Sequence, residues 1–227
     1  MNPLTGVIGE AWRMYRTHAA HLLTIAFAVY VVAVIIEAVL AGFLGVVGAL
    51  LASIVGIIAA FLLQAALVKA VEDVRDGRVD LSLSETLQVA RPFVGRVGVA
   101  SVLAGIAIGL GLVLLIVPGL FLITIWCLVV PVIVLEGVGS LQSFGRSREL
   151  VRGFGWNVFG TLAAVFVLLI LADIVISLIL SPLGEPARQV ISNLISGTVV
   201  APFLALVVTL GYFRLRDAHQ SYPSHPG

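Results

Sequence analysis

The sequence predicts an all-α integral membrane protein with six membrane-spanning helices, arranged as three helical hairpins with both chain ends in the cytoplasm. Of the 227 residues, 60% are hydrophobic and only 11% are charged, whereas soluble domains carry about 25% charged residues. A chain this apolar cannot cover its own surface with polar groups, so lipid must surround much of it. The sequence has no ten-residue segments of alternating hydrophobicity, which disfavours a membrane β-barrel.

Six apolar stretches are long enough, or nearly long enough, to cross a bilayer. A hydrocarbon core of about 30 Å needs about 20 apolar residues in a helix. The fourth stretch is the shortest and is interrupted by Pro131. Glycine and proline residues at 45–48, 117–119 and 181–186 break the helices and connect the stretches in pairs. The expected spans are residues 21–44, 47–70, 97–117, 120–135, 157–180 and 194–212.

The basic residues predict the orientation of these spans. Of the 13 lysines and arginines, all except Arg188, that is 12, fall at one set of helix ends or in the segments next to them. The positive-inside rule places that set in the cytoplasm. An odd number of spans would distribute the same charges over both sides of the membrane.

The chain also resembles three copies of one unit, at residues 1–76, 77–137 and 138–216, followed by a polar tail at 217–227 that we expect to be disordered. In each unit an amphipathic segment precedes the pair of spans. The first, at about 3–18, places Val7, Ala11 and Tyr15 at helical spacing on one face. An amphipathic helix with a basic edge is expected to lie in the headgroup plane of the membrane.

Arginines in and beside these segments are candidate contacts for anionic lipid headgroups. Each basic side chain near an anionic leaflet contributes about 1 kcal/mol of attraction. A simpler interpretation remains open, because positive charge on the cytoplasmic side is expected of any such protein. The candidates are Arg13, Arg16, Arg91, Arg96, Arg146, Arg148 and Arg152.

Small residues at four-residue spacing predict close helix packing. Glycine and alanine let helix backbones approach one another in lipid, where the hydrophobic effect gives no drive for association. We expect these stripes to mark contacts within the chain, although the motif does not distinguish them from contacts in a homo-oligomer. The stripe of the second span is Gly48, Ala52, Gly56 and Ala60, and that of the third is Gly105 and Gly109.

Two acids within the spans, Glu37 and Asp173, are the strongest candidates for a polar or ion site. Ionisable residues inside a membrane are often functional, and Gln64 on the second span is expected to face protein rather than lipid. The acids could line a cavity that binds a cation or passes protons. Alternatively, they are protonated or reach the outer interface.

The sequence contains no catalytic constellation that we can assemble. Cys127 is the single cysteine, which excludes a disulfide within the chain and a cysteine metal cluster. A net charge of +1 gives no indication of a nucleic-acid partner. We therefore expect no metal, no cofactor and no enzymatic activity.

One stretch carries a family resemblance. It runs from Ile116-Val117-Pro118-Gly119-Leu120 through Val130-Pro131-Val132 to Glu136-Gly137, and continues as Ser140-Leu141-Gln142-Ser143-Phe144-Gly145-Arg146. This pattern resembles the membrane domain of glycerophosphodiester phosphodiesterases, and that of related stand-alone prokaryotic membrane proteins of unknown function. The resemblance implies a prokaryotic plasma membrane and a link to lipid metabolism. The catalytic barrel of that family would need about 250 residues, so we do not expect hydrolase activity from this chain.

The expected function is therefore that of a non-enzymatic membrane module, associated with lipids or with a membrane partner in lipid metabolism. The alternative is a small channel or transporter that uses Glu37 and Asp173.

Overall fold

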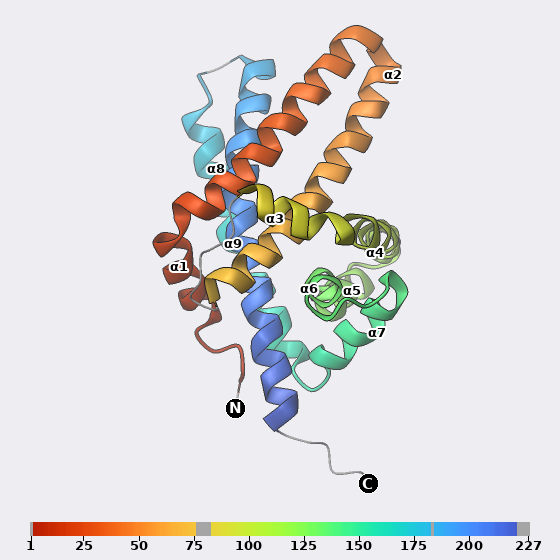
Figure 1. Cartoon of the computed structure of the whole chain (residues 1–227), viewed down its shortest axis with the longest axis vertical. Helices are drawn as coiled ribbons and strands as arrows, with labels where there is room; N and C mark the ends of the chain where they lie inside the picture. Colours follow the sequence, from red (N-terminus) through yellow and green to blue (C-terminus); the bar gives the residue numbers. More distant parts are fainter. Residues whose placement is uncertain (1, 76–82, 183, 222–227) are drawn as a thin grey trace.

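The computed structural model describes residues 2–75, 83–182 and 184–221. Every regular element within these ranges is a helix, which confirms the predicted all-α class (Figure 1). The boundary between the first two predicted units, at 76–77, lies outside the described residues. The helices are α1 (Val7–Thr17), α2 (Ala19–Arg75), α3 (Leu83–Ala90), η1 (Arg91–Phe93), α4 (Val94–Leu114), α5 (Ile116–Trp126), α6 (Val129–Glu136), α7 (Ser140–Val151), α8 (Gly155–Ile179) and α9 (Glu185–Ser221).

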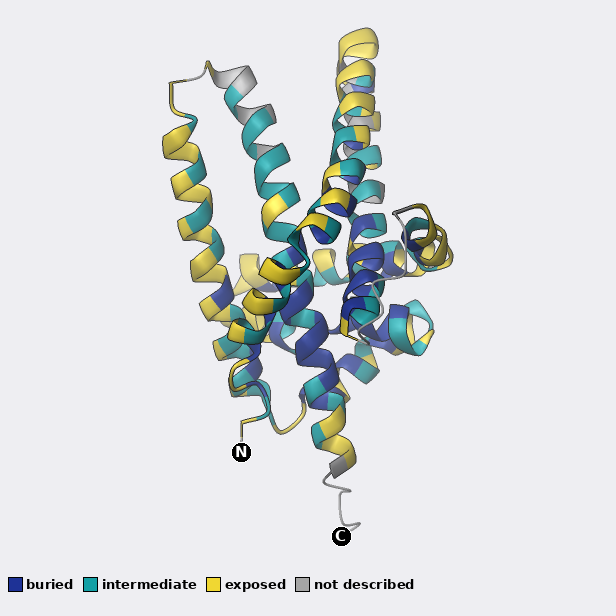
Figure 2. Cartoon of the chain, turned by 60° about the vertical axis from the view of Figure 1, so that its left-hand side comes forward, coloured by how far each residue is buried: buried dark blue, intermediate teal, exposed yellow. Residues whose placement is uncertain are grey.

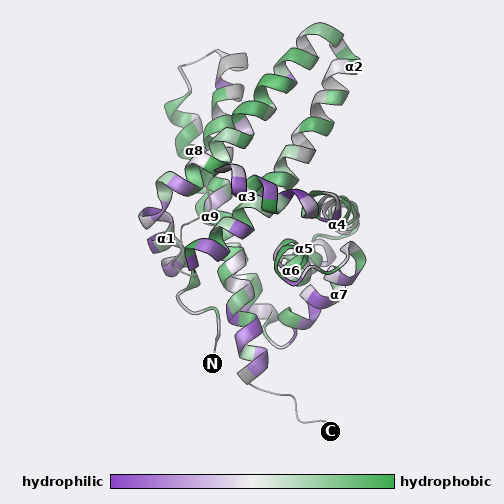
Figure 3. Cartoon of the chain, in the orientation of Figure 1, coloured by the Kyte–Doolittle hydropathy of each residue, from purple (hydrophilic) through white to green (hydrophobic). Residues whose placement is uncertain are grey.

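Six helical segments in the described part of the chain are long and apolar enough to cross a membrane, as the sequence predicted. Figure 3 shows the hydrophobic residues along the arms of α2 and along α8, and more hydrophilic residues on α1, α3 and α7. The protein is therefore of the multi-pass membrane class. The six segments are Ala19–Leu40, Ile54–Arg75, Ser84–Leu114, Ile116–Glu136, Gly155–Ile179 and Leu194–Gln220.

The apolar helices do not all share one direction. Figure 1 shows α4 and α5 nearly along their axes, whereas α2 and α9 extend along the vertical. The sequence predicts that six helices cross the membrane side by side, each with one cytoplasmic and one outer end. That arrangement stays a prediction.

Helix α2 reverses direction at Gly45 and so forms two long arms (Figure 1). Gly45 has φ +54° and ψ −129°, a backbone conformation that glycine adopts without steric penalty. The sequence predicted a break at 45–48, and the reversal lies at the first of these positions.

The turn between α4 and α5 lies at Leu115, two residues before the predicted break. Leu115 is extended, with φ −156° and ψ 134°. Pro118 is the third residue of α5 rather than part of the turn. Proline is tolerated there because backbone N–H groups in the first helical turn have no partner within the helix. Beside the turn the two backbones nearly touch, since a Cβ on Gly111 would lie 3.1 Å from the Cα of Gly119.

The fourth apolar segment is broken between α5 and α6, at Cys127 and Leu128. Pro131 explains the break, because its ring clashes with the carbonyl four residues earlier and it has no N–H to offer. Ser147 of α7 forms hydrogen bonds to two backbone groups beside the break. Its Oγ donates to the carbonyl of Ile125 at 2.7 Å and accepts from the N–H of Leu128 at 3.3 Å.

Changing Ser147 to alanine is expected to lower the free energy of unfolding by about 2 kcal/mol, because two backbone groups would lose a buried partner. Ser143→Ala is the matched control, since Ser143 is equally buried but bonds only the nearby Ser140 carbonyl. The measurement is unfolding of the detergent-solubilised protein by added sodium dodecyl sulfate. Equal losses in the two variants would contradict a specific role for Ser147.

Helix α1 lies along α9 rather than across its end, and its predicted position in the headgroup plane stays a prediction. At one end Leu4 contacts Gly211, and Arg214 pairs with Glu10. At the other end the Tyr15 hydroxyl donates to the carbonyl of Val199 at 3.0 Å. These contacts, together with the ring of Phe203 against Tyr15, hold the segment against its neighbour.

The predicted disordered tail begins too early. Helix α9 continues to Ser221, and residues 222–227 lie outside the described part. Long-range contacts hold the last helical turns, because Asp217 lies 3.9 Å from Arg75 and the His219 ring packs edge-on against Phe154.

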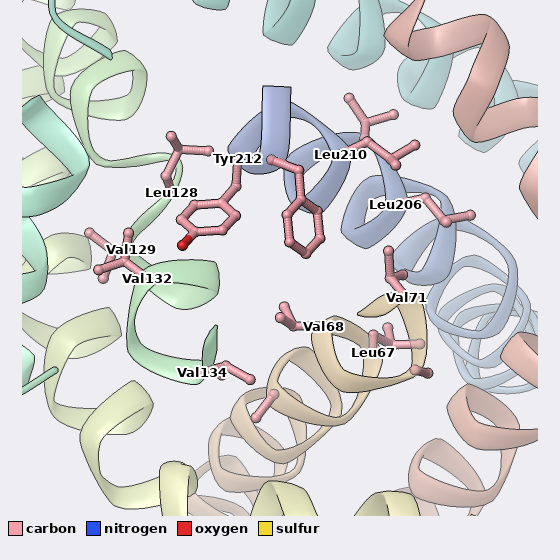
Figure 4. Close-up of a cluster of buried hydrophobic side chains, with 14 of the residues drawn as sticks. Leu67, Val68, Val71, Leu128, Val129, Val132, Val134, Leu206, Leu210 and Tyr212 are labelled. Carbon is pink, nitrogen blue, oxygen red and sulfur yellow. The ribbon is translucent and has the colours of Figure 1, made fainter. Parts of the chain in front are cut away.

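The buried core lies away from the α2 turn, where side chains are mostly exposed (Figure 2). Figure 4 shows the centre of the core, where α2, the segment around the α5–α6 break and α9 meet. Tyr212 is the largest side chain there and is 1% exposed. The surrounding side chains are Leu67, Val68, Val71, Leu128, Val129, Val132, Val134, Leu206 and Leu210.

Candidate functional site

The two intramembrane acids contact different helices. The carboxylate of Glu37 lies against Gly56 on the other arm of α2. Asp173 on α8 is exposed and accepts a hydrogen bond of 3.1 Å from the hydroxyl of Ser196 on α9. Gln64 was expected to face protein, and this was wrong, because its side chain is exposed at the edge of a pocket that neither acid borders. The structure therefore does not gather the three residues into one site.

The two small-residue stripes differ in whether they contact another helical segment of the chain. Gly48 and Gly56 lie against Leu40 and Glu37 of the first α2 arm, as contacts within the chain. Ala60 lines the same pocket as Gln64, and the Ala52 side chain is not among those described. The stripe on α4 was expected to pack within the chain, and this was wrong. A Cβ on Gly105 or Gly109 would meet nothing within 4 Å, because both lie on a face of α4 turned away from its neighbours.

The seven candidate arginines divide into two groups. Arg96 donates to the Gly137 carbonyl at 2.8 Å, and Arg146 pairs with Glu136 and Glu149. The other five are exposed, and none of their guanidinium groups forms a hydrogen bond or ion pair with a residue that the structure describes. These five are Arg13, Arg16, Arg91, Arg148 and Arg152.

The two arginines of α1 lie at different places along α9. Tyr15, the neighbour of Arg16, contacts Val199, and Arg214 lies 15 residues further along α9. Fifteen helical residues span about 22 Å. Arg16 therefore lies away from the basic end of α9, whereas Arg13 lies about one helical turn from Glu10, the partner of Arg214.

A polar network closes the end of α6. Glu136 accepts hydrogen bonds from Arg146 Nε at 2.9 Å and from the Tyr212 hydroxyl at 2.9 Å. The hydrogen bond to Glu136 is the main reason why the pKa of Arg146 is raised above its ordinary value. The sequence offered no signal for Tyr212, which lies 76 residues from Glu136. The network fixes α7 and α9 against the end of α6.

A basic pocket lies beside this network, between α5, α7 and the start of α8. Its volume is about 600 Å³. Arg148 and Arg152 border it, one helical turn apart, and Phe121 and Ile125 of α5 supply its apolar wall. Glu149 also borders it, but that carboxylate lies 3.3 Å from Arg146 Nη1 and is thereby partly neutralised. The pocket thus combines two free positive charges with an apolar surface.

The surroundings of the basic pocket are typical of a membrane interface. Trp156, in the first turn of α8, is 85% exposed. Tryptophan is enriched where membrane-spanning helices meet the headgroup region. The basic pocket therefore lies beside the first turn of α8, where an exposed tryptophan is typical of the headgroup region.

Among the described residues, no group of three histidine, cysteine, aspartate or glutamate side chains is placed to hold a metal ion. Comparison with protein-family models, with curated proteins and with solved structures finds no match to this chain. The resemblance to the glycerophosphodiester phosphodiesterase membrane domain therefore stays a prediction.

Proposed function

We propose that this chain is a non-enzymatic membrane module that binds anionic lipid headgroups in the basic pocket. The supporting observation is the pairing of Arg148 and Arg152 over the apolar wall formed by Phe121 and Ile125. A phosphate-bearing headgroup fits the two guanidinium groups, since arginine binds phosphate through charge-assisted hydrogen bonds. The adjoining acyl chain would contact the apolar wall.

The proposal includes a topology of three hairpins with both chain ends in the cytoplasm, in the plasma membrane of a prokaryote. It is supported by the distribution of basic residues along the sequence, where 12 of the 13 adjoin one set of predicted helix ends. Arg16 is the exception in the structure, since it lies away from the end of α9 that carries Arg214. Cytoplasmic leaflets are rich in anionic lipid, so the basic pocket would meet its ligand there. A membrane partner in lipid metabolism could use the same bound lipid.

A channel or transporter based on Glu37 and Asp173 has less support. The two acids contact different helices, and neither borders a pocket with the other.

Changing both Arg148 and Arg152 to glutamine is expected to weaken phosphatidylglycerol binding about 30-fold. Each arginine near anionic lipid contributes about 1 kcal/mol, and about 2 kcal/mol corresponds to this factor. Native mass spectrometry of the protein, titrated with phosphatidylglycerol and with phosphatidylcholine, measures the two affinities. Binding of zwitterionic phosphatidylcholine should change far less.

The matched control is Arg13→Gln with Arg16→Gln, which removes the same charge from exposed arginines outside the basic pocket. If this control loses as much affinity as the pocket variant, net charge rather than the pocket binds the lipid. If neither variant loses affinity, the proposed function is wrong.

A further inference from the structure

A second, uncharged pocket faces the break between α5 and α6. It has a volume of about 210 Å³ and lies between both arms of α2, the break itself and α9. Cys127 and Pro131 of the broken segment line one side of it. Because proline has no N–H, the helical partner of the Cys127 carbonyl is missing at this place. The basic pocket shares no residue with it.

Three polar side chains from three different segments border this uncharged pocket. They are Tyr30 on the first arm of α2, Gln64 on the second arm and Thr209 on α9. None of them forms a hydrogen bond with a residue that the structure describes. Thr209 is fully buried, and its Oγ1 has no partner there.

A buried hydroxyl without a partner is unfavourable, and native proteins nearly always satisfy such a group. The three side chains offer both donors and acceptors. Gln64 is exposed, so the uncharged pocket is open beside it. Thr209 itself has no accessible surface, so a polar group that enters beside Gln64 would satisfy Thr209 Oγ1 only after a small displacement of the pocket wall.

The rest of the lining restricts what this ligand can be. No residue that lines the uncharged pocket carries a charge, and an unpaired charge is costly to bury. The other lining residues are apolar, among them Leu63, Leu67 and Leu204. A cavity of about 150 Å³ is known to hold benzene. The uncharged pocket, at about 210 Å³, therefore has room for a molecule slightly larger than benzene.

We propose that the uncharged pocket binds a neutral, hydroxyl-bearing molecule with an apolar body, and that Thr209 and Gln64 hydrogen-bond its hydroxyl group. This chemistry has two sources in a membrane. One is a small free alcohol, and the other is the free hydroxyl of a neutral lipid such as diacylglycerol. Because the site is separate from the basic pocket, its failure would not affect the proposed function.

The experiment is photolabelling of the full chain in liposomes with a benzyl alcohol that carries a trifluoromethyl diazirine. Mapping of the labelled peptides by mass spectrometry is expected to find the label on segments that line the uncharged pocket. Benzyl alcohol should suppress this labelling, whereas toluene, which has the same ring without the hydroxyl, should suppress it much less. Suppression by dioleoylglycerol would identify neutral lipid as the source, and suppression by benzyl alcohol alone would identify a free alcohol.

Thr209→Val and Gln64→Leu are each expected to weaken suppression by benzyl alcohol about fivefold, the effect of one hydrogen bond. Thr209→Val keeps the shape of the side chain, and removing an unpartnered hydroxyl should not unfold the protein. Thr198→Val is the control, because Thr198 lies on the same helix with an unpartnered Oγ1 but does not line the uncharged pocket. Equal suppression by toluene and benzyl alcohol, scattered labelling, or unchanged suppression in both pocket variants would overturn the proposal.

Discussion

Replacing Gly119 with valine is expected to lower the free energy of unfolding by about 3 kcal/mol, the upper part of the usual range for overpacking. A Cβ at this position would overlap the side chain of Leu112 and lie 2.8 Å from the backbone nitrogen of that residue. The opposing Gly111 leaves no room to move away, since its own Cβ position is 3.1 Å from the backbone of Gly119. The two helices α4 and α5 would therefore have to separate. Unfolding of the solubilised protein by sodium dodecyl sulfate measures the loss.

Gly105→Val is the control, because a Cβ at Gly105 has open space around it. We expect its unfolding free energy to remain close to that of the wild type. If the GxxxG motif on α4 marked the helix contact, Gly105→Val would lose more unfolding free energy than Gly119→Val, which is the opposite of what we expect. A larger loss in Gly105→Val than in Gly119→Val would show that α4 and α5 do not pack as described.

The number and approximate positions of the apolar segments could be predicted from the sequence because they depend on local composition. About 20 consecutive apolar residues suffice to identify a span, whatever lies next to it. The break at Gly45 could be predicted for the same reason. The break near Pro118 was placed two residues late, since proline also fits the first turn of a helix.

Contacts between helices could not be predicted in the same way, because they depend on how each helix is rotated about its axis. The α4 stripe of Gly105 and Gly109 lies on an open face, whereas the close approach uses Gly111 and Gly119. Ser147 was missed for a related reason. Its bonds reach residues 22 and 19 positions away, and a serine in an amphipathic helix gives no local sign of such a role.

The candidate site was predicted in part. Their charge alone made seven arginines candidate contacts for lipid headgroups. Whether each arginine is free to bind a headgroup depends on its contacts with other parts of the fold. The Arg96 side chain bonds a carbonyl 41 residues away, while the guanidinium groups of Arg148 and Arg152 have no partner in the described part of the chain. The apolar wall of the basic pocket comes from α5, so the sequence around the arginines does not reveal it.

Removal of the Glu136 carboxylate by Glu136→Ala is expected to destabilise the protein by about 3 kcal/mol. The Tyr212 hydroxyl belongs to a side chain that is 1% exposed and would lose its acceptor in the core. Arg146, 39% exposed, would lose its closest carboxylate but keep water and Glu149. A hydrogen bond to a charged group contributes about 1.5–3 kcal/mol, and the buried tyrosine accounts for most of the expected loss. The same detergent titration provides the measurement.

A double-mutant cycle with Tyr212→Phe isolates the buried hydrogen bond. Phenylalanine keeps the ring in the core, so Tyr212→Phe alone should cost about 1.5 kcal/mol, the lower end of the range for a hydrogen bond to a charged group. In the Glu136→Ala background the same change should be neutral or stabilising, because the hydroxyl there has no acceptor and its removal relieves a buried polar group. Strictly additive losses would mean that Tyr212 and Glu136 do not interact, and that the end of α6 is held against α9 by apolar packing alone.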